Sequence, residues 1–173
     1  MESALISLVS IALIIIATVT MTMSSFFSVS TVADSWKQME QQAGSIRRTK
    51  IVAVPPENYA GGSVNLTVRN EGQTNLGNFP HWDVIAQYQA GGIYYIAYTA
   101  DYPPGSNEWA VEGIYQSDNS TEVFDPNILN PGEKMKVVVN LDPEIDEGET
   151  GRITASTPNG VTSQCLVTRP LPP

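Results

Sequence analysis

The sequence predicts an α+β protein, in which a long hydrophobic N-terminal α-helix is followed by an immunoglobulin-like antiparallel β-sandwich head. Three observations lead to this prediction. The stretch from Ser3 to Ser25 contains no Asp, Glu, Lys, Arg, Pro or Gly. Apolar residues then recur at heptad spacing for about 20 further residues, and after Pro55 and Pro56 they alternate with polar residues as in strands. The predicted domains are a helical segment, residues 1–50, and a β-sandwich head, residues 51–173.

The helical segment is longer than an ordinary membrane span. A run of roughly 20 apolar residues is enough to cross the hydrocarbon core of a bilayer, which is about 30 Å thick. Beyond that run, two sets of residues spaced by seven continue the apolar pattern: Val29, Trp36, Ala43 and Val32, Met39, Ile46. This repeat is typical of a helix that packs against other helices. We predict one helix from residue 2 to 43, ending at Gly44, with a length of about 60 Å.

Small and hydroxyl-bearing residues are interspersed through the apolar run. Pairs separated by four positions, which let helices approach closely in an apolar medium, are Ser3/Ser7, Thr18/Thr22 and Ser24/Ser28. Their hydroxyls can bond to the carbonyl one turn earlier and so remain satisfied when buried. We therefore expect contacts with other helices along most of the segment. A single-span anchor is the alternative; a cleaved signal peptide is disfavoured because the apolar run is too long and has no basic start.

The charge of the chain lies almost entirely in the head. Residues 1–50 hold four basic and three acidic residues, whereas residues 51–173 hold five basic and fifteen acidic ones. Proteins that bind nucleic acid carry basic patches, so this composition argues against such a partner. An acidic head is instead expected on a solvated exterior surface.

Short alternating segments separated by turns predict about seven strands in the head. The clearest segments are 64–68, 82–88, 93–99, 135–141, 153–155 and 161–168. Asn159-Gly160 is a strong hairpin signal before the last of these. The stretch from Tyr102 to Pro131 has little periodicity and is predicted to be an extended surface loop.

The head offers little that could perform catalysis or hold a cofactor. His81 is the single His and Cys165 the single Cys, so the chain can build neither a disulfide nor a His/Cys metal cluster. No phosphate-binding glycine loop or zinc motif occurs. We predict a protein that is not an enzyme and needs no cofactor.

Two weaker site signals remain. The acidic turn 142–149 supplies closely spaced carboxylates, and its Asp142, Glu144 and Asp146 are candidate Ca²⁺ ligands, although a solvated loop is the favoured interpretation. Glycosylation triplets begin at Asn65 and Asn119, of which Asn119 is the better candidate because it falls in the predicted loop.

The chain resembles the archaellins, the type IV pilin-like subunits of the archaeal swimming filament. The resemblance is most specific in residues 1–50. In the head it rests on three segments: Val68-Arg69-Asn70-Glu71-Gly72-Gln73-Thr74, Leu129-Asn130-Pro131-Gly132-Glu133-Lys134-Met135 and Thr157-Pro158-Asn159-Gly160-Val161. Leu5 stands where type IV pilins carry a Glu, which favours the archaellin branch. No basic leader precedes Met1, so the chain is expected to be in its mature form.

The resemblance implies a structural subunit of an extracellular helical filament. In that family a membrane peptidase removes a leader, and an ATPase with a membrane platform protein extracts the subunit from lipid. The helices then assemble into a homopolymer with the heads outside. The expected helix assembly interface comprises Leu5, Leu8, Ile11, Ile15, Phe26, Val29, Val32, Trp36, Met39, Ala43 and Ile46.

Two other functions remain as alternatives. An accessory protein of the same machine would be tethered by its helix and would bind an envelope or stator partner. An adhesive or carbohydrate-binding sandwich would instead need exposed aromatic residues, for which the candidates are Tyr98, Tyr102, Trp109 and Tyr115.

Overall fold

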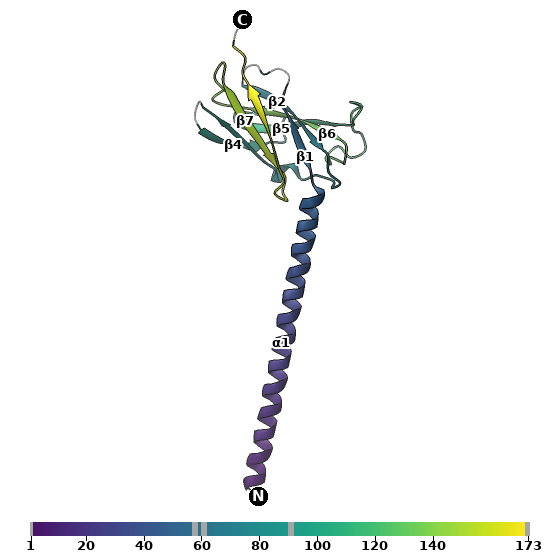
Figure 1. The fold of residues 1–173 in the computed structure, drawn as a ribbon, viewed down its shortest axis with the longest axis vertical. Coiled ribbons are helices and arrows are strands. Elements are labelled where there is room, and N and C mark those ends of the chain that lie inside the picture. The colour runs from purple at the N-terminus through teal and green to yellow at the C-terminus, as the bar shows by residue number, and fades with distance from the viewer. Residues whose placement is uncertain (1, 57–58, 60–61, 90–91, 172–173) are drawn as a thin grey trace. The chain divides into compact units, whose positions relative to one another are not determined.

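The computed structural model describes residues 2–56, 59, 62–89 and 92–171, with the side chains of Glu2, Ala4 and Leu5 outside the description (Figure 1). The chain divides into two compact units, Met1–Gly44 and Ser45–Pro173. The elements in chain order are α1 (Glu2–Arg48), β1 (Ile51–Val54), β2 (Ser63–Asn70), the 3-10 turn η1 (Phe79–His81), β3 (Asp83–Tyr88), β4 (Gly92–Tyr98), β5 (Glu108–Tyr115), β6 (Lys134–Asn140), β7 (Thr150–Ser156) and β8 (Thr162–Thr168).

The single long helix predicted from the sequence is present, but the prediction that it ends at Gly44 was wrong. The helix α1 continues for another turn to Arg48. Thr49 closes that turn by donating its N–H to the carbonyls of Ser45 and Ile46, both at 3.1 Å. The local preference of glycine for helix ends is overridden by contacts that the following turn makes with the head, described below.

Seven hydroxyls of the helix are satisfied within it, in the way expected for Thr22 and Ser28. Each of the seven donates to the carbonyl four residues earlier at 2.8–3.0 Å, in the pairs Ser10–Ile6, Thr18–Ile14, Thr20–Ile16, Thr22–Thr18, Ser28–Ser24, Thr31–Phe27 and Ser35–Thr31. Because the hydroxyls use their hydrogens internally, they can enter an apolar medium without an unmet donor.

Gly44 lies inside the helix with open space around it, so replacing it should stabilise the chain. A Cβ at this position meets nothing within 4 Å, and Ala is about 1 kcal/mol more favourable than Gly in a helix interior. We expect Gly44→Ala to slow hydrogen exchange of the surrounding helix amides about fivefold in the full-length chain. The neighbouring change Ala43→Gly should accelerate the same exchange, and a faster rate in Gly44→Ala would contradict the expectation.

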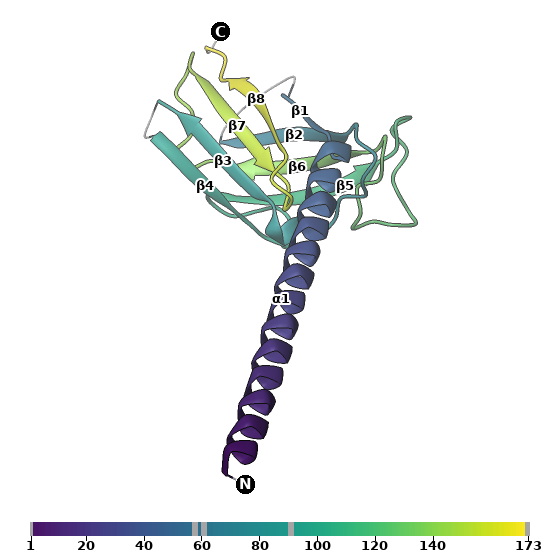
Figure 2. The same ribbon diagram turned by 60° about the horizontal axis from the view of Figure 1, so that its bottom comes forward.

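The head is a two-layered, nearly closed β-sandwich. Its strand order is β1-β2-β6-β5-β4-β3-β7-β8, and Figure 2 shows β3, β4, β7 and β8 crossing the layer that contains β2, β5 and β6. Every neighbouring pair is antiparallel except β4 and β5, which run parallel over two residues. The first and last strands approach each other where the Ala53 N–H donates to Ser163 Oγ at 2.8 Å. The predicted β-sandwich is thus confirmed, with eight strands.

In most of the strands every second side chain points inward and fills the space between the two layers. In β2 the buried apolar residues are Val64, Leu66 and Val68, and their partners across the pairing with β6 are Val139, Val137 and Met135. Trp82 and Trp109 are among the largest fully buried side chains, and aromatic side chains contribute much apolar area to a core.

Two strands were not predicted. The four-residue strand β1 is short, and β5 lies within the stretch that we expected to be a surface loop; that expectation was wrong for Glu108–Tyr115. In β5 the consecutive residues Trp109 and Ala110 are both buried, and its register with β6 shifts between Val111 and Gly113. A bulge of this kind breaks the period-two pattern on which strand prediction depends.

Candidate assembly interface

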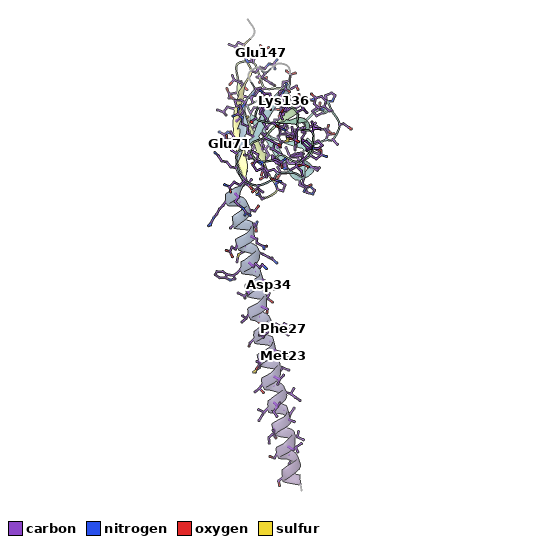
Figure 3. All side chains as sticks on the ribbon, turned by 90° about the vertical axis from the view of Figure 1, so that its right-hand side faces the viewer. Met23, Phe27, Asp34, Glu71, Lys136 and Glu147 are labelled. Carbon is purple, nitrogen blue, oxygen red and sulfur yellow. The ribbon has the colours of Figure 1, made fainter. Side chains whose placement is uncertain are left out.

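The apolar side chains of the helix are exposed in the isolated chain. Every described side chain from Ile6 to Ala43 is exposed, and Figure 3 shows Met23 and Phe27 projecting from the ribbon. Trp36 is 69% exposed. The expected interface residues that are exposed are Leu8, Ile11, Ile15, Phe26, Val29, Val32, Trp36, Met39, Ala43 and Ile46. The side chain of the remaining one, Leu5, lies outside the described residues.

In the first half of the helix the apolar side chains surround it instead of forming one stripe. Residues from Leu13 to Ile16 are four consecutive apolar positions, and successive residues are rotated by about 100° on a helix. A helix that is apolar all round is buried in protein or in lipid. Among the described residues, α1 is the one helix long and apolar enough to cross a membrane. It therefore requires either lipid or other helices as its surroundings.

The last turn of the helix is held by the loop that follows β2. The N–H groups of Glu71 and Gln73 donate to the carbonyls of Lys50 and Arg48 at 2.9 and 2.7 Å. Lys50 Nζ also lies 2.7 Å from a carboxylate oxygen of Glu71. The next residue, Gly72, passes close to the backbone of Arg48 and Lys50. Carbonyls at a helix C-terminus lack partners within the helix, and here other segments supply them.

The hairpin between β7 and β8 contacts the same turn. The predicted Asn-Gly hairpin is present, with Gly160 at φ 85°. The Asn159 side chain donates to Thr49 Oγ1 at 2.8 Å and to Ser45 Oγ at 3.2 Å. The turn residue was recognisable in the sequence, but nothing in the local pattern indicated that its amide binds the helix end.

Asn70 joins the other two segments on which the resemblance rested. Its buried amide donates to the carbonyls of Thr74 and Leu129 at 2.8 and 2.9 Å, and its oxygen accepts the Gly72 N–H at 3.0 Å. The N–H of Asn70 donates to the Glu133 carbonyl at 3.0 Å. All three segments thus belong to one hydrogen-bonded region around residues 45–50.

The candidate Ca²⁺ ligands have other partners. Asp142 Oδ2 accepts a hydrogen bond from Ser106 Oγ at 3.1 Å, and Glu144 forms an ion pair with Arg169 at 2.8 Å. Among the described residues no group of three or more His, Cys, Asp or Glu side chains could hold a metal ion. The structure therefore does not bring Asp142, Glu144 and Asp146 together as a cation site.

Both candidate glycosylation residues are exposed. Asn65 lies on the outward face of β2, and Asn119 occupies a turn with φ 72°. The side chain of Asn119 contacts Lys134 Nζ. Modification at either position remains a prediction.

The remaining candidate residues are mostly buried or half-buried. Burial raises the pKa of the Cys165 thiol to about 11, so it stays protonated at neutral pH. Trp109 is buried against Tyr98, and Tyr115 lies half-buried beneath Lys136. Of the four aromatics proposed for carbohydrate binding, Tyr102 alone is exposed, so they do not form a common platform.

A feature that sequence analysis missed is a loop between β5 and β6 that presents two apolar side chains. Val123 and Phe124 are 76% and 87% exposed. Beneath them the buried Glu122 carboxylate accepts the N–H groups of Val123, Phe124 and Asp125 at 3.0, 2.7 and 3.4 Å. The carboxylate thus fixes the conformation of a loop whose apolar residues point outward.

This arrangement predicts a pH-dependent loop. The hydrogen bond from the Phe124 N–H is the main cause that lowers the pKa of Glu122 below its ordinary value of 4.5. A lowered folded-state pKa contributes stability above the ordinary pKa and loses it as the pH falls through the folded value. In an NMR titration from about pH 6 to about pH 2, the Val123 and Phe124 amide shifts should therefore change with a midpoint below 4.5. In Glu122→Gln this transition should vanish, and a midpoint at or above the ordinary value would contradict the assignment.

Comparison with known proteins supplies both a family and related folds. The chain matches the archaeal-type flagellin family over residues 3–165, and no curated protein matches. The flagellin FlaB1 from Methanocaldococcus jannaschii is similar with a TM-score of 0.56 and 11% identity, covering 72% of this chain and 92% of that one.

Two further solved structures are similar. The archaeal flagellum of Methanospirillum hungatei strain JF1 has a TM-score of 0.55 and 12% identity, covering 95% of this chain and 91% of that one. The archaellum periplasmic stator protein FlaG from Sulfolobus acidocaldarius has a TM-score of 0.51 and 21% identity, covering 68% and 98%. These likenesses concern the fold; the family match extends over the apolar helix as well as the head, and the chain belongs to the archaeal-type flagellin family.

Proposed function

We propose that this chain is the structural subunit of an extracellular, archaellum-like helical filament, which assembles through its N-terminal helix and carries its β-sandwich outside. The observation that carries the proposal is the helix itself, which is apolar on all sides in its first half, has heptad-spaced apolar residues in its second half, and is exposed in the isolated chain. Surrounding it with the helices of identical subunits satisfies that surface. Contacts between non-equivalent surfaces that repeat without closing generate open helical filaments.

Different forces act on the two halves of the proposed interface. Leu8, Ile11 and Ile15 leave lipid for protein on assembly, so close packing through the small residues must stabilise them. Phe26, Val29, Val32, Trp36 and Met39 leave water, and burying side chains of this size contributes about 1.5–3 kcal/mol each. We therefore assign most of the assembly strength to the second half. Leu5, Ala43 and Ile46 complete the proposed interface at its two ends.

Before assembly the apolar helix would reside in the membrane. The proposal includes the machinery that such a precursor requires: a leader peptidase, an assembly ATPase and a membrane platform protein. The helix has the length and composition for membrane insertion, and the internally bonded hydroxyls lower the cost of residing in lipid.

An accessory, stator-like role is the second candidate, because the head resembles FlaG in fold. The filament role is favoured because the family match includes the helix, and because the similarity to the Methanospirillum hungatei flagellum covers 95% of this chain against 68% for FlaG. A tethered accessory protein would not require a helix suited to close contact along most of its length.

The two roles differ in where the chain is found after cells are sheared. Negative-stain electron microscopy of the released material, with mass spectrometry of its main protein band, is the direct test. We expect thin filaments with this chain as the major component. A chain that stays with the membranes and is absent from every filament would overturn the filament role in favour of the accessory one.

A further inference from the structure

The head carries a second exposed apolar surface besides the Val123–Phe124 loop. On the outward side of β4, β3, β7 and β8 the pairing registers place two rows of side chains across four strands. One row is Tyr95, Ile85, Thr154, Gln164 and the other is Ile93, Gln87, Arg152, Leu166. Ile93, Tyr95 and Leu166 are 71%, 62% and 59% exposed. We call these eight residues the sheet face.

The sheet face avoids the negative charge that dominates the head. Neither row contains a carboxylate, although the head has fifteen. The nearest carboxylate on these strands is that of Asp83, which lies one row further along β3 than Ile85. It accepts a hydrogen bond from the Tyr95 hydroxyl at 3.2 Å. Two like-charged heads repel each other, so a surface used for contact between them should exclude carboxylates.

One cation on the sheet face has a matching anion beside the loop. Arg152 is the single basic residue in β3, β4, β7 and β8, and it pairs with no carboxylate among the described residues. Asp125 follows Phe124 directly and is exposed. Its side chain likewise has no ion pair within the part of the chain that the structure describes. The loop and the sheet face are thus complementary in charge as well as in apolar character.

The two surfaces lie on different sides of the head. In Figures 1 and 2 the β5–β6 loop projects at one end of the head, whereas β4 and β3 lie at the other. The loop therefore cannot fold back onto the sheet face of its own head. A contact between a projection on one copy and a flat surface at the far side of the next can repeat indefinitely, as a filament requires.

We propose that in the filament the Val123–Phe124 loop of one subunit packs on the sheet face of a neighbouring copy, with Asp125 facing Arg152. The proposal rests on the filament function argued above and assigns it a specific contact between heads. The loop is held in place by Glu122 before docking, so little conformational entropy is lost when it binds. Phe124 supplies the central aromatic anchor that protein interfaces favour.

Chemical cross-linking of intact filaments tests the contact. The single native cysteine is buried, so introduced surface cysteines are the reactive ones. Filaments of the double variant Phe124→Cys/Ile93→Cys, treated with a short bismaleimide, should give a ladder of dimers, trimers and longer oligomers. Each single variant should stay monomeric. The control Phe124→Cys/Arg69→Cys should also stay monomeric, because its second cysteine lies at an exposed position of β2, outside the sheet face.

Several outcomes would overturn the docking. Filaments of Phe124→Cys/Ile93→Cys that give only monomers would do so, as would dimers from Phe124→Cys alone, which would indicate a symmetric contact. Cross-links to a different protein would assign the surface to another partner. These results differ from failure of the proposed function, in which no filament contains the chain at all.

A charge exchange supplies an independent readout. Asp125→Arg and Arg152→Asp should each lower the temperature at which filaments dissociate, because each places like charges across the contact. The double variant should recover most of the loss. A double variant no more stable than the worse single one would contradict the pairing of these two side chains.

Discussion

Trp36→Asp should abolish filaments while leaving the head folded. Trp36 lies in the heptad-spaced half of the helix and is 69% exposed before assembly. On assembly the wild-type side chain leaves water, which contributes about 3 kcal/mol or more for an aromatic of this size. An aspartate at the same position would bury an unpaired carboxylate, which costs several kcal/mol in addition. Because every subunit carries the change, no contact along the polymer escapes it.

The measurement is the amount of filament released by shearing, together with the near-ultraviolet circular dichroism of the full-length chain extracted in detergent. Trp36→Phe keeps an apolar aromatic and should still form filaments. Gln38→Asp adds the same charge about 200° further around the helix, away from the heptad-spaced residues, and should be tolerated. Normal filaments from Trp36→Asp would remove this half of the helix from the assembly interface.

The helix could be predicted from sequence because its determinants are local. An apolar run without charges, Pro or Gly has few alternatives to a helix in lipid or among other helices, and the i−4 hydroxyl bonds need only neighbouring residues. Its C-terminus could not be predicted, because Arg48 and Lys50 obtain their hydrogen-bond partners from Gln73 and Glu71, more than twenty residues away along the chain.

The strands of the head also divide into those that local sequence predicted and those that it did not. Those exposed on one side, such as β2 and β3, show the alternation from which they were predicted. In β5 the consecutive residues Trp109 and Ala110 are both buried, and a register shift between Val111 and Gly113 follows them, so the strand shows no regular alternation. The bulge and the burial of both faces, which local sequence does not encode, made the difference.

The proposed head contact has no sequence signature either. Val123 and Phe124 in a stretch rich in Pro, Asn and Asp could equally have been core residues, and apolar residues are found at protein surfaces too often to be diagnostic. What distinguishes them is that Glu122 binds three successive N–H groups beneath them. Similarly, the sheet face is a surface only because four strands align Ile93, Tyr95 and Leu166.

Gly72→Ala should loosen the contact between the last turn of the helix, residues 45–48, and the loop that follows β2. Gly72 does not adopt a positive φ, so the requirement for glycine there is one of space. An added Cβ would lie 2.5 Å from the Lys50 nitrogen and 2.6 Å from the Arg48 oxygen. Both are backbone atoms, which cannot rotate away as the end of a side chain could. The substitution must therefore displace the loop and break the bonds that Glu71 and Gln73 make to the helix end.

We expect a loss of about 3 kcal/mol in the free energy of unfolding of the head, at the upper end of what overpacking costs. For a domain of this size that corresponds to a fall in Tm of about 10 °C, measured by circular dichroism of the full-length chain in detergent. Gly44→Ala is the matched control, because the same methyl group meets open space there. If chain entropy alone decided the outcome, both alanines would stabilise, since each restricts the unfolded state equally. Changes in Tm of opposite sign at the two positions would show that the close approach of the Gly72 loop holds the final turn of the helix. A Tm of Gly72→Ala equal to or above that of the native chain would refute this.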